Sequence, residues 1–514
     1  MKSLAAALST TVAHNGPRRA VRDAGGDWTW DEFGRRIACA AQALRALGLR
    51  EGDRFAVFAR NSPRFEVWKW AGFAAGVVPV PINWRLAPLE IAHILSDAAC
   101  RHVLLDPAFA DSFRHEALAP WRSRIVWLSG QSPDANPAAD ALLAQAQPAR
   151  PVELDPAADA LLLYTGGTTG RSKGVRLSHA NILANALAFG LGVGARREDV
   201  YLHAAPMFHS ADLLATGWML AGATQAYLPQ FSPAEFFRAV STYRISATVT
   251  VPTMLMMAVS DPGFASADLS SLRTLIYGAA PMAYEWIVRV GEAFPHVDYF
   301  NCYGLTETAP DLTIFDAREF RAAIASGDRS GPVLSVGKPN ALNELRVVDR
   351  NGQEVPRGDV GELIARGPNI MTGYLNLPAE TASALRGGWL YTGDIARIDE
   401  HGYVYLLDRL KDLIVSGGEN IYTSEVEAAI HRHPAVAECA VIGVPDERLG
   451  ETPFAVIQLR PGARTTEAEI IEHCRNFIGG YKIPRRMAFV EQMPRSAMGK
   501  ILKADLRRKF AASK

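Results

Sequence analysis

Backbone amides, hydroxyl groups and one ammonium are concentrated in the segment from Thr165 to Gly174, whose sequence is TGGTTGRSKG. The apolar run Ala160–Leu163 lies just before it and predicts a buried strand that ends in this loop. Glycines let the backbone approach an anion, hydroxyls add donors, and Lys173 adds positive charge. The segment predicts a polyphosphate site, although it is not a Walker A loop, because Lys173 precedes a glycine rather than Ser or Thr. The alternative is a flexible surface loop without a ligand.

Three more segments place a charged side chain at or near a glycine. Glu307 follows the turn Gly304-Leu305-Thr306, Asp394 follows Gly393, and Lys500 follows Gly499 near the C-terminus. Magnesium prefers hard oxygen ligands and often binds one carboxylate together with substrate phosphates, which suits a glutamate. An aspartate can accept hydrogen bonds from both hydroxyls of a ribose, and a lysine can stabilise charge that develops on a phosphate. Taken singly, each has a plainer interpretation, as a solvated helix start, a turn aspartate or a surface charge.

In this order, the four segments resemble the signature of the AMP-forming acyl-CoA synthetases. That adenylating superfamily also includes firefly luciferase and the adenylation domains of peptide synthetases. The resemblance spans most of the chain and includes Arg409, downstream of Asp394. Two departures are visible, since Gly166 and Ser172 stand where many relatives have serine and proline. The Thr-Gly-Gly-Thr-Thr-Gly form of the loop is similar to that of many fatty acyl-CoA synthetases.

The resemblance implies a role for each residue, with ATP, Mg²⁺ and coenzyme A as the small molecules bound. The implied phosphate ligands are Thr165, Gly166, Gly167, Thr168, Thr169, Gly170 and Lys173. The other implied nucleotide and coenzyme A contacts are Gly278, Ala279, Ala280 and Tyr303 at adenine, Asp394 and Arg409 at ribose, and Gly417 and Gly418 along the pantetheine tunnel. The implied catalytic residues are Lys500, Thr306, Glu307 and His209, and Glu307 with Thr165 would hold Mg²⁺.

Helix and strand patterns alternate through the first third of the chain, which predicts a layered α/β fold with mainly parallel strands. Thr29 with Glu32 predicts a capping box, and Ser178, Ser424 and Thr466 predict three further helix starts. The stretch 129–156 reads as a surface connection. The predicted fold class is α/β: a large N-terminal domain of layered α/β structure with a small β-rich subdomain, then a small α+β C-terminal domain. The predicted boundaries are residues 1–408, a hinge at 409–412, and 413–514.

The overall composition is that of an ordinary globular protein and excludes several classes. The chain has 514 residues, and 54 Lys+Arg balance 54 Asp+Glu, so no basic surface for nucleic acid is expected. Its five cysteines form no Cys-x-x-Cys pair and predict buried thiols rather than disulfides or a metal site. No apolar run reaches the length of about 18 residues that a transmembrane segment needs. We expect a cytoplasmic enzyme, monomer or homodimer.

The predicted reaction has two steps. A carboxylate attacks the α-phosphate of ATP to give acyl-AMP, and the thiol of coenzyme A then displaces AMP, with the small domain turning about Lys411 between the steps. Medium- or long-chain fatty acids are the leading substrates and aromatic acids follow, because the implied pocket residues are mostly apolar. Those residues are His209, Trp218, Val251, Thr253, Tyr277, Ala279, Asn301 and Leu305. The alternatives are a ligase that loads a carrier protein, a luciferase-like oxygenase and a non-catalytic AMP-binding module.

Overall fold

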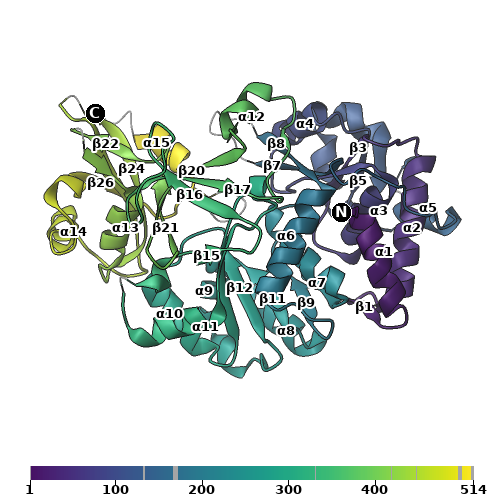
Figure 1. Cartoon of the computed structure of the whole chain (residues 1–514), viewed down its shortest axis with the longest axis horizontal. Helices are drawn as coiled ribbons and strands as arrows, with labels where there is room; N and C mark the ends of the chain where they lie inside the picture. The colour runs from purple at the N-terminus through teal and green to yellow at the C-terminus, as the bar shows by residue number, and fades with distance from the viewer. Residues whose placement is uncertain are drawn as a thin grey trace. The chain divides into compact units, whose positions relative to one another are not determined.

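The computed structural model describes residues 2–130, 134–165, 172–329, 331–417, 419–446, 448–495 and 501–510. The chain divides into two compact units. Unit 1 comprises Met1–Leu345 and Ala365–Leu390, and unit 2 comprises Arg346–Ile364 and Tyr391–Lys514. Helices and strands alternate from the purple N-terminal part to the teal middle of the chain (Figure 1), as the sequence predicts.

The largest sheet of unit 1 has nine strands in the order β15-β14-β13-β12-β11-β9-β10-β1-β2. In this order, every pair of neighbouring strands between β13 and β1 is parallel. The strand β2 pairs antiparallel with β1, β14 with β13, and β15 with β14. Its strands are β1 Arg19–Arg22, β2 Trp28–Thr29, β9 Val200–His203, β10 Thr224–Tyr227, β11 Ala247–Thr250, β12 Thr274–Gly278, β13 Asp298–Tyr303, β14 Thr313–Phe315 and β15 Lys338–Pro339. The associated helices are α6 His179–Gly192, α7 Thr216–Ala221, α8 Pro233–Tyr243, α9 Pro252–Ser260, α10 Tyr284–Ala293 and α11 Ala317–Ser326.

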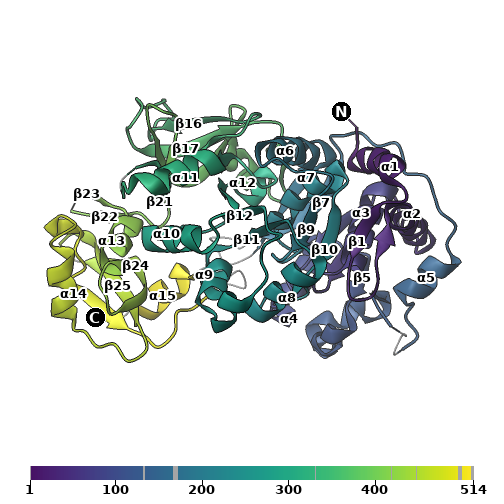
Figure 2. The ribbon, with the colours of Figure 1, turned by 90° about the horizontal axis from the view of Figure 1, so that it is seen from below.

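Register fixes which side chains share a face of this sheet. Val249, Ile276 and Phe300 are direct neighbours on β11, β12 and β13, and they pack in one core cluster with Trp218 of α7. Because successive strand residues point to opposite faces, Tyr277 lies on the other face, where its ring meets that of Phe320 of α11. In both Figure 1 and Figure 2, α6 and α7 lie on one side of β12 and α10 and α11 on the other.

A second sheet of unit 1 is wholly parallel, in the order β4-β3-β5-β6. Its strands are β3 Arg54–Phe58, β4 Val78–Pro81, β5 His102–Leu105 and β6 Ile125–Trp127, and the neighbouring helices are α1 Leu4–Asn15, α2 Trp30–Ala46, α3 Pro63–Ala75, α4 Pro88–Asp97 and α5 Ala139–Gln145. The capping box of Thr29 and Glu32 opens α2 as predicted. The stretch predicted as a surface connection contains α5, a short helix that its alanine- and proline-rich sequence does not announce.

A small antiparallel sheet in the order β18-β8-β7 carries the glycine-rich segment. It consists of β7 Asp159–Thr165, β8 Lys173–Ser178 and β18 Gly373–Tyr374, and α12 Pro378–Ala384 follows β18. Thr165 and Lys173 are register partners, so the glycine-rich segment joins two strands of a hairpin. Ser178 caps α6, as predicted.

The β-rich region predicted after residue 330 forms a five-stranded sheet in the order β16-β17-β20-β19, with β21 also paired to β20. Its strands are β16 Glu344–Val348, β17 Gly361–Arg366, β19 Leu385–Arg386, β20 Trp389–Ile398 and β21 Val404–Arg409. The division between the two units falls within β16, β17 and β20. It therefore differs from a single cut at residue 409, and the predicted domain boundaries remain a prediction.

The C-terminal part of unit 2 is an α+β structure around the sheet β23-β22-β25-β24, with β26 parallel to β25. Its elements are β22 Ile414–Ser416, β23 Glu419–Ile421, α13 Thr423–His431, β24 Val436–Asp446, β25 Gly450–Leu459, α14 Glu467–Cys474, β26 Arg486–Phe489 and α15 Lys503–Phe510. Thr466 caps α14 as predicted, but the predicted cap at Ser424 is wrong. Tyr422 precedes α13 instead, and Ser424 lies inside the helix, where its hydroxyl donates to the carbonyl of Leu407.

All five cysteines are buried and unpaired, in agreement with their wide spacing in the sequence. Across the described part of the chain, no helix combines the length and the apolar character needed to cross a bilayer.

Candidate active site

The described ends of the glycine-rich hairpin bring Lys173 next to an aromatic ring that the sequence analysis did not select. The ammonium of Lys173 lies 5.2 Å from the ring centre of Tyr374 on β18. Thr165 is half-buried at the other end of the hairpin. The predicted phosphate ligands Gly166, Gly167, Thr168, Thr169 and Gly170 lie outside the described residues.

Glu307 stands in a tightly built loop after β13. Gly304 is required there, because a Cβ atom at this position would come within 1.7 Å of the carbonyl oxygen of Pro310. Residues Thr306–Thr308 then form one turn of 3₁₀ helix, η5, and the Thr308 hydroxyl accepts from the N–H of Leu305 at 2.9 Å. Sequence and sterics together fix the backbone that carries Thr306 and Glu307.

Four asparagines hold this loop from outside. The carboxamide of Asn369 donates to the carbonyls of Thr308 (2.8 Å) and Asp311 (2.7 Å), and Asn343 also donates to the Asp311 carbonyl. The N–H of Asp311 donates to Asn185, while the Asp311 carboxyl accepts from Asn340 at 3.0 Å. Burial raises the pKa of Asp311 to about 8, against a smaller opposing effect of the Asn340 hydrogen bond.

The side chain of Glu307 accepts a hydrogen bond from the hydroxyl of Tyr374, which donates to Oε1 at 2.8 Å. Burial, and then the carboxylate itself, raise the pKa of Tyr374 far above its ordinary value, so the phenol keeps its proton. Within the described ranges, no cation pairs with Glu307, and its second oxygen has no hydrogen-bond partner. A half-buried carboxylate with one oxygen uncommitted fits the hard-oxygen coordination of Mg²⁺.

His209 and Thr306 are brought together through Ser210. The Thr306 hydroxyl donates to Ser210 Oγ at 3.2 Å, and both side chains are buried. His209 precedes the 3₁₀ helix η3, Ser210–Ala215, and its Nδ1 accepts from the N–H of Ala211 at 3.3 Å. A neutral His209 ring therefore carries its proton on Nε2, which makes that nitrogen a hydrogen-bond donor.

A buried charge network that the sequence analysis missed fixes the segment on which His209 stands. Lys69 of α3 lies 2.6 Å from the Asp212 carboxylate and 3.0 Å from that of Glu66, and Asp212 also bonds His203 at 2.6 Å. Burial tends to raise the pKa of Asp212, but Lys69 and His203 outweigh it and lower the pKa to about 2. Glu66, His203 and Asp212 lie close enough to suggest a metal site. The Lys69 ammonium already contacts both carboxylates of that cluster, so we interpret it as an ion-pair network.

Asn61 adds a second clamp on the same segment. Its carboxamide donates to the carbonyls of His203 (3.0 Å) and Ala205 (2.8 Å) and accepts from the N–H of Met207 at 2.8 Å. Only 5% of Asn61 is exposed, so these bonds are shielded from water. His209 thus follows a segment anchored at several backbone groups.

The predicted adenine residues follow β12. A Cβ atom on Gly278 would lie 2.5 Å from the carbonyl oxygen of Cys302 on the neighbouring strand, so only glycine fits there. Ala279 is exposed and has a φ of 66°, a left-handed conformation that is unusual for alanine. Ala280 is half-buried, and Tyr303 is buried at the end of β13. Strain at a strand end is common at ligand sites and agrees with the predicted role of this turn.

The predicted ribose residues are partners within unit 2. Asp394 on β20 and Arg409 on β21 are opposite each other in the antiparallel pair, and Arg409 Nε lies 2.7 Å from Asp394 Oδ1. Asp394 is 4% exposed, and its N–H donates to the Thr392 hydroxyl at 3.1 Å. The arginine holds this carboxylate in one orientation, as the predicted role requires.

The predicted coenzyme A and adenylation residues fall partly outside the described ranges, because Gly418 and Lys500 are not described. Gly417 is described, with a φ of 58° and an N–H that donates to the Leu449 carbonyl at 2.8 Å. In the predicted hinge, Lys411 is exposed, and the neighbouring Asp412 pairs with Arg507 at 2.6 Å.

The set of predicted acyl-pocket residues needs correction. Trp218 and Tyr277 lie on opposite faces of the nine-stranded sheet and cannot form one pocket wall. Trp218 is fully buried, and its indole N–H donates to Asp199 at 3.0 Å. The sequence shows that neighbouring strand residues face opposite ways, but it does not show which face α7 covers.

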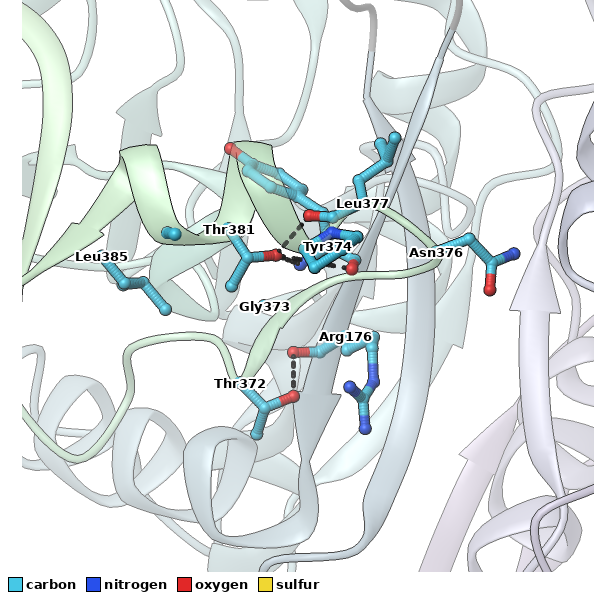
Figure 3. A pocket seen from close by; sticks show the side chains of 10 residues that line it. Arg176, Thr372, Gly373, Tyr374, Asn376, Leu377, Thr381 and Leu385 are labelled. Carbon is cyan, nitrogen blue, oxygen red and sulfur yellow. Dashed lines mark hydrogen bonds between the residues drawn. The ribbon is translucent and has the colours of Figure 1, made fainter.

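A cavity of about 400 Å³ lies between β8, β18 and α12. Arg176, Thr372, Tyr374 and Thr381 are among the residues that line it, and Figure 3 shows the Thr381 hydroxyl between the backbone of Tyr374 and that of Leu377. Arg176 also pairs with Asp159 at 2.9 Å. The cavity thus adjoins the Tyr374 side chain that contacts Glu307.

Known proteins with the same sequence features are adenylating enzymes. The chain matches the family models "AMP-binding enzyme" over residues 8–375 and "AMP-binding enzyme C-terminal domain" over residues 425–500. It is 38% identical over 494 residues to the feruloyl-CoA synthase of Amycolatopsis sp, covering 96% of both chains. It is 33% identical over 477 residues to the long-chain-fatty-acid–CoA ligase FadD13 of Mycobacterium tuberculosis, covering 92% of this chain and 91% of the other.

Comparison of the fold with solved structures leads to the same family. The crystal structure of ATP-bound MatB from Rhodopseudomonas palustris matches with a TM-score of 0.89 and 31% identity, covering 100% of this chain and 99% of that one. The chain therefore belongs to the AMP-binding enzyme family, which confirms the resemblance and the predicted fold class. It is an AMP-forming acid–CoA ligase that uses ATP with Mg²⁺ and takes coenzyme A as a substrate. The roles of individual residues remain predictions.

Proposed function

We propose that this ligase activates a hydrophobic monocarboxylic acid. The observation that carries the proposal is the apolar sheet face beside the His209 segment. Leu214, Ala215 and Trp218, which follow His209 along the chain, pack against Ile276, Phe300 and Cys302. An acid that extends from His209 along this face would meet hydrocarbon, which disfavours dicarboxylates.

Within that class we put aromatic acids first. The feruloyl-CoA synthase, at 38% identity, supports this order. Fatty acids, which the sequence analysis put first, become the second candidate, supported by the 33% identity to the fatty-acid ligase.

The proposed mechanism assigns the first step to residues from both units. Thr165, the glycine-rich loop and Lys173 hold the phosphates of ATP, and Thr306 donates to the α-phosphate. Glu307 would hold Mg²⁺, which would neutralise phosphate charge. Lys500 stabilises the charge that develops as the carboxylate attacks, and Asp394 with Arg409 fixes the ribose.

The second step uses the loop of Gly417 and Gly418. After pyrophosphate leaves, we propose that the C-terminal domain turns about Lys411 and presents this loop. The two glycines then line the path of the pantetheine arm, whose thiol attacks the acyl carbon and displaces AMP.

The experiment is a substrate panel with release of pyrophosphate and formation of the CoA thioester measured separately. Ferulate, benzoate, octanoate, palmitate, acetate and malonate are compared by kcat/KM. We expect an aromatic acid to lead, and acetate and malonate to be weakest by at least tenfold, because each buried methylene adds about 0.8 kcal/mol. A best rate with acetate or malonate would refute the hydrophobic pocket. A best rate with palmitate would refute only the order of the two candidates.

A further inference from the structure

We propose that Tyr374 is a positioning residue for Glu307 and sets how strongly the enzyme binds Mg²⁺ with ATP. The inference rests on the proposed role of Glu307 as the Mg²⁺ ligand. The Tyr374 hydroxyl donates to Glu307 Oε1 at 2.8 Å, and Tyr374 stands 67 residues away in the sequence.

The hydrogen bond leaves one carboxylate oxygen for a metal. A glutamate side chain has three rotatable bonds, and a fixed donor on one oxygen selects the orientation of the other. The N–H of Met371 also donates to the Glu307 carbonyl at 2.8 Å, so the segment that precedes β18 holds the Glu307 backbone as well. The segment 371–374 thus contacts Glu307 twice, once through the backbone and once through a side chain.

The backbone of Tyr374 is itself held in place from two sides. Its N–H donates to the Thr381 hydroxyl at 2.9 Å, and that hydroxyl donates to the Leu377 carbonyl at 2.8 Å, as Figure 3 shows. Its backbone also pairs with Val175 of β8. A donor that is fixed by α12 and β8 can hold a carboxylate without losing much rotational freedom on binding.

The same ring contacts Lys173. The ammonium lies 5.2 Å from the ring centre, within the range of a cation–π interaction. Tyr374 therefore touches both a lysine predicted to meet the phosphates and a glutamate predicted to meet the metal. Its position couples two groups that must act on the same MgATP.

The test is calorimetric titration of ATP in the presence and in the absence of Mg²⁺, using the full chain. In the wild type, we expect Mg²⁺ to tighten ATP binding. Tyr374→Phe keeps the ring and removes the hydroxyl, so it should reduce that Mg²⁺-dependent gain by about tenfold and leave Mg²⁺-free ATP binding unchanged. The Mg²⁺ concentration for half-maximal pyrophosphate exchange should rise by a similar factor.

Tyr164→Phe is the matched control. Tyr164 also donates its hydroxyl to a carboxylate, Asp97 Oδ2 at 2.6 Å, but it does not contact Glu307. Its Mg²⁺ response should stay at the wild-type value. Thr381→Val, which removes the support of Tyr374 without touching its side chain, should shift the Mg²⁺ response in the same direction as Tyr374→Phe but less.

Glu307→Gln separates the two proposals. Loss of the Mg²⁺ effect in Glu307→Gln with a normal response in Tyr374→Phe would overturn the positioning role and leave the role of Glu307 standing. A normal Mg²⁺ effect in Glu307→Gln would overturn the metal role of Glu307 itself. If Tyr374→Phe lowers ATP binding equally with and without Mg²⁺, Tyr374 acts on the nucleotide site rather than on the metal, and the positioning role is overturned. If Tyr374→Phe and Thr381→Val both melt early with an unchanged Mg²⁺ response, Tyr374 serves stability alone.

Discussion

At the residue scale, Asp311 in the loop of Glu307 should make the folding stability of the enzyme depend on pH. Burial raises its folded-state pKa to about 8, whereas an unfolded aspartate titrates near 3.9. Between these values the folded protein keeps a proton that the unfolded chain has lost. Stability is therefore greatest below about pH 4 for this group and falls as pH rises toward 8, by about 1.4 kcal/mol per pH unit.

Asp311→Asn should remove this slope, because a carboxamide stays neutral and can still accept from Asn340. We expect urea unfolding to show the variant more stable than the wild type at pH 8, with the difference shrinking toward pH 5. Fluorescence-monitored unfolding at several pH values measures it. A difference that does not change with pH would mean that Asp311 is not protonated in the folded enzyme.

At the scale of elements, the Lys69 network joins α3 to the segment of His209. Lys69→Met leaves Glu66 and Asp212 buried without their cation, which costs about 3–5 kcal/mol of unfolding free energy. Arg238→Met, which breaks the exposed pair with Glu235 on α8, should cost less than about 1 kcal/mol. Thermal melts of the two variants make the comparison. Equal losses would show that the buried network contributes no more than a surface pair.

The same elements show what a sequence can and cannot predict. The capping boxes at Thr29 and Thr466 were correct because their partners lie three residues away. The predicted cap at Ser424 was wrong, although the local pattern is similar, because the Ser424 hydroxyl donates to the carbonyl of Leu407 instead of capping the helix. The ties of Lys69 to Asp212 and of Tyr374 to Glu307 span 143 and 67 residues, so no local pattern marks them. The glycine-rich loop could be recognised because its glycines, its hydroxyl groups and Lys173 lie within one short stretch of sequence.

At the scale of the whole molecule, the two half-reactions should depend on different residues of the C-terminal domain. Lys500→Ala removes the charge that we propose stabilises attack on the α-phosphate, so pyrophosphate exchange should fall by about 10²–10³-fold. Conversion of pre-made acyl-AMP to the thioester should persist. Gly418→Leu blocks the proposed pantetheine path and should do the reverse, because a side chain there obstructs the thiol without touching the nucleotide.

Both variants are assayed for pyrophosphate exchange and for thioester formation from synthetic acyl-AMP, with ATP binding as a check that the nucleotide site is intact. Lys411→Pro stiffens the proposed pivot between Arg409, which holds Asp394, and Asp412, which holds Arg507. It should keep the first half-reaction and slow the second. If Lys500→Ala and Gly418→Leu impair both half-reactions equally, one fixed arrangement of the C-terminal domain serves the whole cycle. Opposite losses, with Lys411→Pro following Gly418→Leu, would require that the domain turns.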